Sequence, residues 1–312
     1  MPLVNYIPDT FHIGFMRLRH WSFPVSAVLS LISVLAFLTI GLNVGIDFKG
    51  GTLIEVQSTS GPADISTVRQ QVSGLNLGEV QIQEFGSNTE LLIRIGSSAD
   101  VQGPAVIERV REAIGSSYTI RRVEVVGPSV SGELVQQSII ALVLGLLMIL
   151  AYLWFRFEWQ FAIGATVTTL HDIVLVIGLY SILQLEFDLT AVAAILTIMG
   201  YSLNDTVVIY DRIRDMLRRY KRMPINELLD ASINATVSRT IIVAATTFFA
   251  TLALYIFGGE VLRGFSLSIL FGVVVGTYST IFIAVPILIY LGLHARGETA
   301  AQAKGAAVQP AE

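Results

Sequence analysis

The position most suited to chemistry is Asp205, a carboxylate inside the otherwise apolar run 189–210. Arg239 lies near the start of another apolar run. An ionisable side chain within a membrane helix costs roughly 2.5 to 3.5 kcal/mol on insertion scales, so it usually faces a partner or a water path and marks an ion or proton route. The two residues therefore indicate membrane machinery that handles charge.

Polar side chains accompany Asp205. Tyr201 precedes it by one helical turn and shares its face, with Asn204 beside it. At 1.5 Å per residue, Asp205 and Arg239 both lie roughly 10 Å inside the same membrane boundary, so antiparallel neighbouring helices would bring them to one level. Two interpretations follow. In the first, the charges are structural: they form a permanent buried pair, or Arg239 extends to the lipid headgroups. In the second, Asp205 takes up and releases a proton as its distance to Arg239 changes.

Two further apolar runs carry polar candidates. His171 and Asp172 lie about ten residues into the run 161–183, where a histidine suits a proton relay, although such a pair also serves as a hydrogen-bonded packing feature. Thr247 can hydrogen-bond across a helix bundle or line a water path. The chain has no cysteine and only four scattered histidines, so we expect neither a metal site nor a cofactor other than the proton.

The composition is typical of a protein that spans a membrane. Hydrophobic residues make up 53% of the 312 positions and charged residues 14%, and the mean hydropathy is +0.68. About 20 helical residues cross a bilayer core of about 30 Å. Six runs meet that length: 21–42, 138–155, 161–183, 189–210, 241–257 and 265–293. The first run is too long for a signal peptide and lacks a cleavage site, so we expect it to remain as an anchor.

Basic residues predict the orientation, because short cytoplasmic loops collect lysine and arginine. Six such residues follow the fourth run, so the segment 211–231 is expected to be a basic cytoplasmic loop that meets anionic membrane lipid. By alternation the N-terminal segment 1–20 and a disordered tail, 294–312, are also cytoplasmic. The block 136–293 then holds transmembrane helices two to six, and the polar segment 43–135 lies outside.

The outer segment has the pattern of a small α+β domain. Alternating runs at 52–57, 79–85, 91–95 and 119–126 predict strands, and amphipathic runs at 64–75 and 104–114 predict helices. The order βαββαβ predicts a ferredoxin-like domain between the first two membrane helices. A glycine-bearing junction flanks the domain on each side. Such a junction can serve either as a rigid elbow or as a hinge, and we favour the hinge. The junction residues are Gly45, Asp47, Gly50, Gly51, Gly127 and Pro128.

Several motifs, in a consistent order along 19–293, resemble the SecF branch of the SecD/SecF family of protein-export membrane proteins, within the resistance-nodulation-division superfamily. The motifs are GIDFKGG at 45–51, VGPSVS at 126–131, TLHD at 169–172, GYSLNDTVVIYDRIR at 200–214, SRT at 238–240 and FGG at 257–259. Asp205 and Arg239 match the membrane aspartate and arginine of that family.

The resemblance implies a multi-pass protein of the bacterial inner membrane with a periplasmic domain and cytoplasmic termini. It implies pairing with SecD in a twelve-helix unit beside the SecYEG translocon. Proton flow would drive the outer domains to capture and release a translocating polypeptide. We expect no enzyme activity and no nucleic-acid partner, and the absence of a nucleotide-binding loop assigns ATP use to a partner.

Two alternatives remain open at this point. In the first, the chain is a structural membrane subunit that binds or stabilises without carrying protons. In the second, Asp172 and Asp205 form the carboxylate pair of an intramembrane aspartyl protease. The second is disfavoured, because the Tyr-Asp and Gly-x-Gly-Asp signatures of that class are replaced here by His171-Asp172 and Leu203-Asn204-Asp205.

Overall fold

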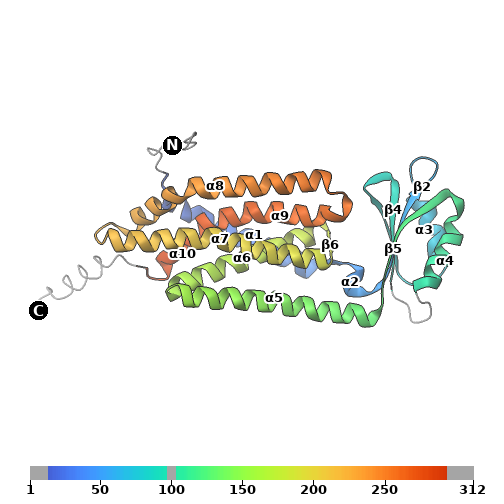
Figure 1. Ribbon diagram of the computed structural model, residues 1–312, viewed down its shortest axis with the longest axis horizontal. Helices are drawn as coiled ribbons and strands as arrows, with labels where there is room; N and C mark the ends of the chain where they lie inside the picture. The colour runs from blue at the N-terminus through green and yellow to red at the C-terminus, as the bar shows by residue number, and fades with distance from the viewer. Residues whose placement is uncertain (1–12, 97–102, 294–312) are drawn as a thin grey trace, which may run out of the picture.

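The computed structural model describes residues 13–96 and 103–293, and it places a helix bundle at one end and a small sheet domain at the other (Figure 1). The expected tail 294–312 and residues 1–12 of the N-terminal segment lie outside the described residues. Within the described part, six helical segments are long and apolar enough to cross a membrane. They are α1 (Phe15–Thr39), α5 (Pro128–Arg156), α6 (Trp159–Leu183), α7 (Leu189–Arg219), α8 (Ile225–Phe257) and the composite α9 to α10 segment (Glu260–Tyr290). The prediction of six spans is confirmed.

The α7 and α8 helices continue well beyond their apolar runs. Asp215 pairs with Arg212 and Arg219, three and four residues away, and such pairs stabilise the last turns of α7. The first turns of α8 are helical because Leu228, Leu229 and Ile233 are buried in the core of the bundle. As a result the segment 211–231, expected as a loop, is helical except for residues 220–224.

The segment between α1 and α5 folds as the predicted βαββαβ domain. Its elements are β2 (Gly51–Ser58), α3 (Ile65–Ser73), β3 (Val80–Phe85), β4 (Ser87–Gly96), α4 (Gly103–Ile114), the short 3-10 turn η1 (Gly115–Ser117) and β5 (Tyr118–Val126). The strand order is β3-β4-β2-β5 and every pair is antiparallel, which confirms the ferredoxin-like prediction. The membrane helix α5 begins at Pro128, directly after β5, and therefore includes the expected domain residues 128–135.

The sheet has two differently used faces because side chains alternate along a strand. Leu91, Ile93 and Ile95 of β4 are buried against α3 and α4. Leu92 and Arg94 point to the opposite face, where Leu92 joins Leu53 and Ile46 in a small apolar cluster. That second face is turned toward the bundle, so the domain has one face for its own core and one for attachment.

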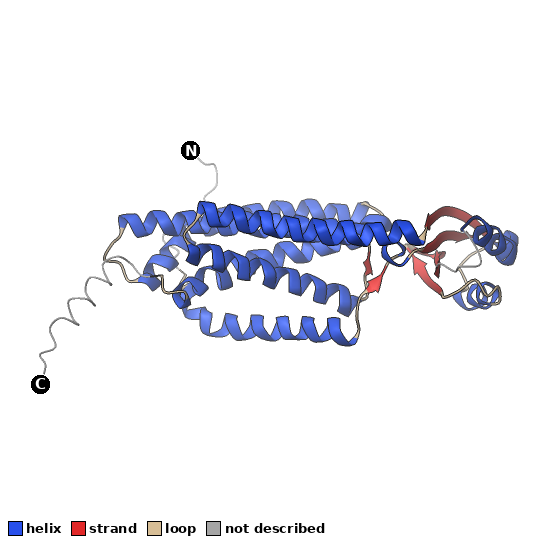
Figure 2. Cartoon of the chain, turned by 90° about the horizontal axis from the view of Figure 1, so that it is seen from below, coloured by secondary structure: helices blue, strands red, loops and turns tan. Residues whose placement is uncertain are grey.

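A second, two-stranded sheet, which no sequence pattern predicted, joins the domain to the bundle. β1 (Asn43–Val44) lies parallel to β6 (Glu186–Phe187), with Asn43 opposite Glu186 and Val44 opposite Phe187. Figure 2 shows these strands between the helices and the larger sheet. Directly after β1 comes the single-turn helix α2 (Ile46–Lys49). Strands of two residues are too short to show an alternating pattern.

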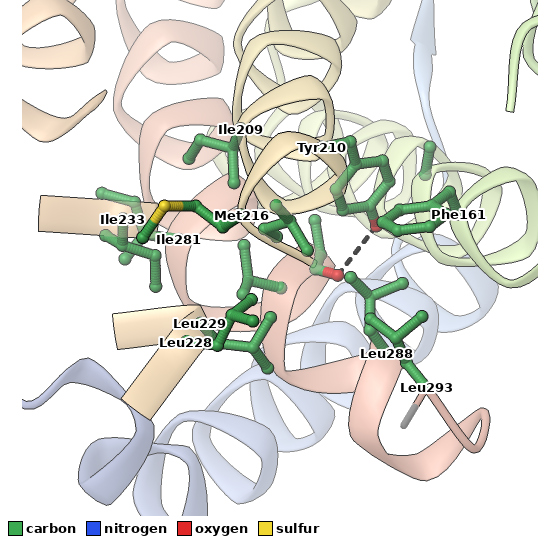
Figure 3. Close-up of a cluster of buried hydrophobic side chains, with 14 of the residues drawn as sticks. Phe161, Ile209, Tyr210, Met216, Leu228, Leu229, Ile233, Ile281, Leu288 and Leu293 are labelled. Atoms are coloured by element: carbon green, nitrogen blue, oxygen red, sulfur yellow. Dashed lines mark hydrogen bonds between the residues drawn. The ribbon is translucent and has the colours of Figure 1, made fainter. Parts of the chain in front are cut away.

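The last membrane segment is interrupted by a π-helical turn, η2 (Thr280–Ala284), before α10 (Val285–Tyr290). Pro286 has no N–H and leaves the carbonyl of Phe282 without its usual donor. The Ser22 hydroxyl of α1 donates to that carbonyl at 3.0 Å, and the Tyr210 hydroxyl of α7 donates to the carbonyl of Ala284 at 2.8 Å (Figure 3). Side chains from two neighbouring helices thus stabilise the irregular turn.

Small residues let α9 (Glu260–Ser279) approach α7 closely. Gly272 packs directly on Ile198, and a Cβ atom at this glycine would lie 2.6 Å from Ile198 Cδ1 and 2.8 Å from its Cγ2. Gly276 lies against Ser202 in the same way, with 3.2 Å available to an added Cβ. Close approach of backbones is the usual role of small residues in membrane helices.

Gly272→Ala is expected to destabilise the protein by about 1 to 3 kcal/mol, because the added methyl group overlaps a buried side chain. Gly264→Ala on the same helix is the matched control, since a Cβ atom there meets nothing within 4 Å. Thermal unfolding of the two purified variants in the same detergent is the measurement. Equal unfolding temperatures would contradict the packing assigned to Gly272.

Candidate functional site

Asp205 is buried inside the bundle on α7, with 1% of its surface exposed. Neither of its carboxylate oxygens has a hydrogen-bond partner among the described residues. A buried polar group without a partner is costly, and a buried charge more so. The site that the sequence singled out is therefore an unsatisfied carboxyl group within the membrane span.

Arg239 lies on α8, a helix that contacts α7, but its side chain is exposed at the outer surface of the bundle. In the part of the chain that the structure describes, no ion pair or hydrogen bond joins Arg239 to Asp205. The geometry thus differs from that of a permanent buried pair. The two groups remain on neighbouring helices without direct contact.

Asp172, the other buried acid, has the opposite environment. It too is 1% exposed, but the hydroxyl groups of Ser202 and Ser279 donate to its Oδ2 at 2.6 and 2.8 Å. His171 Nδ1 lies 3.0 Å from its Oδ1. These contacts join α6, α7 and α9 through one side chain. Asp172 is therefore held in place by hydrogen bonds, whereas Asp205 is not.

Hydroxyl groups extend the polar layer formed by Asp172, Ser202 and Ser279 toward the π-helical turn. Thr206 Oγ1 lies 3.1 Å from Thr280 Oγ1 and also donates to the carbonyl of Ser202 at 3.1 Å. Sequence reasoning missed Ser202 and Ser279, although Ser202 lies within the motif around Asp205. The reason is that a serine in a membrane helix commonly bonds its own backbone, so its type alone does not reveal a partner on another helix.

The remaining predicted residues of the bundle lie around this layer. Tyr201 is half-buried on α7, one turn before Asp205. Asn204 is exposed on the outer face of α7, and Thr247 is half-buried on α8. His171 is largely buried, and its Nε2 atom has no hydrogen-bond partner within the described ranges. The structure therefore brings His171 and Asp172 together and leaves Asn204 at the surface of the bundle.

The junction between the domain and the bundle is built on the first turn of α7. Asp47 of α2 accepts a hydrogen bond from Leu189 N at 3.0 Å, and Asp188 accepts one from Ala191 N at 2.9 Å. The first N–H groups of a helix have no partner within the helix, and a negative charge there also interacts favourably with the helix dipole. Two carboxylates therefore cap the helix that carries Asp205, and one of them belongs to the domain junction.

Glycines allow the junction to pack this closely. A Cβ atom at Gly45 would lie 2.9 Å from Glu186 Oε1, and one at Gly51, whose φ is +138°, would overlap the carbonyl of Ile95. Gly50, with φ of +72°, lies against Ser131 of α5. Gly127 is extended and leads into Pro128, the first residue of α5, a position where proline is well tolerated. The two glycine-bearing junctions therefore meet.

An ion pair crosses the same junction. Arg94 of β4, on the sheet face turned toward the bundle, contacts Glu186 of β6. Burial raises the pKa of the Glu186 carboxyl above its usual range, while the guanidinium of Arg94 opposes that rise. A cavity of about 380 Å³ opens beside this pair, lined by residues of the sheet, of β6 and of the start of α9. The domain is thus attached to the bundle by an ion pair, a helix cap and a two-stranded sheet.

Ser279→Ala is expected to destabilise the bundle by about 1 to 3 kcal/mol, because it removes one donor from the buried carboxylate of Asp172. Ser266→Ala is the matched control: Ser266 is also buried on α9, but its hydroxyl donates only to Leu262 O of its own helix. Chemical or thermal unfolding of both variants measures the difference. If Ser266→Ala lowers the stability as much as Ser279→Ala does, the hydrogen bond to Asp172 does not explain the effect of Ser279→Ala.

Asp47→Ala is expected to lower the free energy of opening at the first turn of α7 by about 0.5 to 2 kcal/mol, because Leu189 N loses its acceptor. Hydrogen exchange at peptides covering 186–192 measures this opening. Lys49→Ala serves as the control, since Lys49 is exposed on the same short helix. Unchanged exchange in Asp47→Ala would show that Asp188 alone caps α7.

Comparison with family models gives two matches. Residues 106–294 match the model described as "Protein export membrane protein SecD/SecF, C-terminal". Residues 35–61 match the "SecD/SecF GG Motif", which includes the junction around Gly50 and Gly51. The first match covers all the membrane helices after the sheet domain, and the second covers the attachment of the domain.

Similar proteins and structures carry related names. The protein translocase subunit SecF of Cereibacter sphaeroides is 42% identical over 301 residues, which cover 93% of each chain. The protein translocase subunit SecDF of Brucella abortus is 43% identical over 302 residues, which are 96% of this chain but 40% of that protein. The crystal structure of SecDF from Thermus thermophilus, described as a translocon-associated membrane protein, superposes with a TM-score of 0.83 at 32% identity, over 90% of this chain and 39% of that one. The chain therefore spans about two fifths of the SecDF relatives.

Proposed function

The chain belongs to the SecD/SecF family of protein-export membrane proteins, and on that basis we propose that it acts as a SecF subunit that couples proton flow to Sec-dependent protein translocation. It is a transport subunit rather than an enzyme. The membrane is the bacterial inner membrane, with the basic end of the bundle and both termini in the cytoplasm and the sheet domain in the periplasm. Positive charge gathered at the end of α7 supports this orientation.

The observation that carries the proposal is the unsatisfied carboxyl group of Asp205. A network of hydrogen bonds to both oxygens fixes a carboxyl group in one position, whereas a membrane carboxyl group without such a network is open to a proton or a water path. Asp172 has such a network and Asp205 does not. Asp205 is therefore the proton carrier, and Asp172 is a fixed polar support with His171.

Arg239 supplies the charge that responds to the proton. An opposite charge that approaches a carboxyl group favours its ionised form. When Asp205 is protonated, the arginine gains nothing by approaching it and remains at the outer surface of α8. When Asp205 loses its proton, the pair attracts across the contact between α7 and α8. One charge that crosses 100 mV yields about 2.3 kcal/mol, enough to bias a two-state arrangement.

The α7 helix connects this event to the outer domain. Its first turn is capped by Asp47 of the junction, and the strand that precedes it, β6, pairs with β1. A small rotation or shift of α7 therefore acts directly on the attachment of the sheet domain. A related solved structure is described as SecDF in a super-membrane-facing form, at a TM-score of 0.68 and 28% identity. On this proposal the sheet domain takes more than one position as it captures and releases the translocating polypeptide.

The outer face of the bundle supports a partner of the SecD type. Asn204 of α7 and Arg239 of α8 are exposed there, and an amide or guanidinium facing hydrocarbon lacks hydrogen-bond partners. In the SecDF relatives a chain of this kind is part of a protein more than twice as long. A SecD subunit that packs on this face would satisfy both groups, and the assembled pair would work beside the SecYEG translocon.

The hydrogen bonds of Asp172 disfavour an aspartyl protease. Both of its oxygens are engaged, by Ser202, Ser279 and His171, so it is poorly placed to share a proton or a water with Asp205. A purely structural subunit remains the relevant competitor. It predicts that the carboxyl group of Asp205 is dispensable.

Asp205→Asn is expected to abolish the stimulation of protein export by the proton gradient while leaving export without a gradient unchanged. The amide keeps the volume of the side chain but neither binds nor releases a proton. The measurement is translocation of a preprotein into inverted membrane vesicles that carry the variant with its SecD partner, with and without an uncoupler. Vesicles are matched for the amount of assembled SecD and SecF.

Asp211→Asn is the matched control. Asp211 is a carboxylate on the same helix, but it is paired with Arg156 at the half-exposed end of the bundle. It is expected to retain the gradient response. If Asp205→Asn also retains it, the proton-coupling role is wrong and Asp205 is a packing residue.

A further inference from the structure

A basic cavity lies at the end of the bundle remote from the sheet domain. It measures about 560 Å³ and lies between the start of α6, the end of α7 and the end of α10. Arg214, Arg218 and Lys221 line it; Arg214 and Arg218 share one face at the end of α7, and Lys221 lies in the turn that follows. Glu158 is the one acidic group among the lining residues, so the described lining carries an excess of two positive charges.

The cations that line this cavity form no ion pair within the described residues, whereas three neighbouring arginines do. Arg156 is paired with Asp211, and Asp215 is paired with both Arg212 and Arg219. Among the described residues, no acidic side chain forms an ion pair with the three cations of the cavity. Asp211 and Asp215 therefore pair with arginines outside the cavity, and the three cations inside it remain available to a ligand.

The best buried of these cations has an unused donor. Arg214 Nη1 donates to the carbonyl of Arg156 at 3.4 Å, which orients the guanidinium. Its Nε atom is buried and has no hydrogen-bond partner within the described part of the chain. A buried donor without a partner is costly, and an anion in the cavity would satisfy it.

Aromatic side chains place the cavity at the level of the membrane surface. All three tryptophans, Trp21, Trp154 and Trp159, are exposed at this end of the bundle, with 75%, 65% and 50% of their surfaces accessible. Tryptophan gathers where hydrocarbon meets the lipid headgroups. Trp159 is the first residue of α6 and lies next to Glu158 of the cavity.

The rest of the lining is apolar. Phe161, Leu217 and Leu293 complete the wall, and Phe161 and Leu293 belong to the core of the bundle (Figure 3). A soluble anion would gain nothing from these side chains. A phospholipid would present its phosphate to the arginines and its glycerol and first methylene groups to the apolar wall.

We propose that this cavity binds the phosphate of an anionic phospholipid headgroup from the leaflet on the basic side. Arg214 and Arg218 hold the phosphate, because guanidinium groups suit phosphate geometry, and Lys221 adds charge at the mouth. Zwitterionic lipids carry the same phosphate, but the two excess positive charges favour a headgroup with net negative charge. The site is specific, in contrast to diffuse attraction between a basic loop and an anionic surface.

The test uses the full chain, purified in detergent and analysed by native mass spectrometry with added phosphatidylglycerol or phosphatidylethanolamine. Arg214→Gln/Arg218→Gln is expected to weaken phosphatidylglycerol binding about ten- to thirtyfold. Arg219→Gln/Arg222→Gln is the matched control, since it removes the same charge from the same segment outside the cavity. It is expected to stay within about twofold of wild type. Arg218→Gln/Lys221→Gln, whose side chains are exposed, repeats the test if the first variant unfolds.

Each outcome decides the proposal. Selective loss in the cavity variants, with preference for phosphatidylglycerol over phosphatidylethanolamine, supports it. Equal loss in the cavity and control variants would show diffuse attraction and overturn it, as would binding that no variant changes. Displacement of the lipid by millimolar inorganic phosphate would overturn it by assigning the cavity to a free anion. Equal binding of both lipids would overturn it by showing that the headgroup needs no net negative charge.

Discussion

Hydrocarbon supplies no hydrogen-bond partners, and this constraint governs the bundle from one end to the other. Where the chain departs from regular helix, another helix provides the missing group: Ser22 donates to the carbonyl that Pro286 leaves open, and Tyr210 donates to the carbonyl of Ala284. The same rule explains the hydroxyl groups gathered around Asp172. A buried carboxyl group without hydrogen-bond partners departs from this rule, and Asp205 is such a group among the described residues.

The contrast between the two aspartates gives the bundle its chemistry. They lie on adjacent helices in sequence and are equally buried, so burial alone does not distinguish them. Contacts with Ser202, Ser279 and His171 hold Asp172 in one position, which suits a structural support. Asp205 makes no such bonds within the described residues.

α7 connects the sheet-domain junction, the candidate site and the basic cavity. Its first turn is capped by the junction of the sheet domain, its middle carries Asp205, Tyr210 steadies the π-helical turn, and its last turns line the basic cavity. Gly272 and Gly276 of α9 lie directly against Ile198 and Ser202 of α7, so the two helices pack closely. A lipid held at one end and a domain attached at the other would both act on the same rigid element.

The sequence alone determined much of this protein, because its signals are local and strong. Length and hydropathy predicted six spans, alternation predicted the four strands around Leu91 and Ile93, and the isolated charge of Asp205 marked the span that carries the candidate site. Tertiary structure alone decided which polar groups have partners. Ser202 and Ser279 meet Asp172 from two other helices, Asp47 caps a helix 142 residues away in the chain, and Asp211 of α7 pairs with Arg156 of α5. Such pairings depend on how helices distant in sequence pack together, and residue type and spacing along one segment carry no record of that packing.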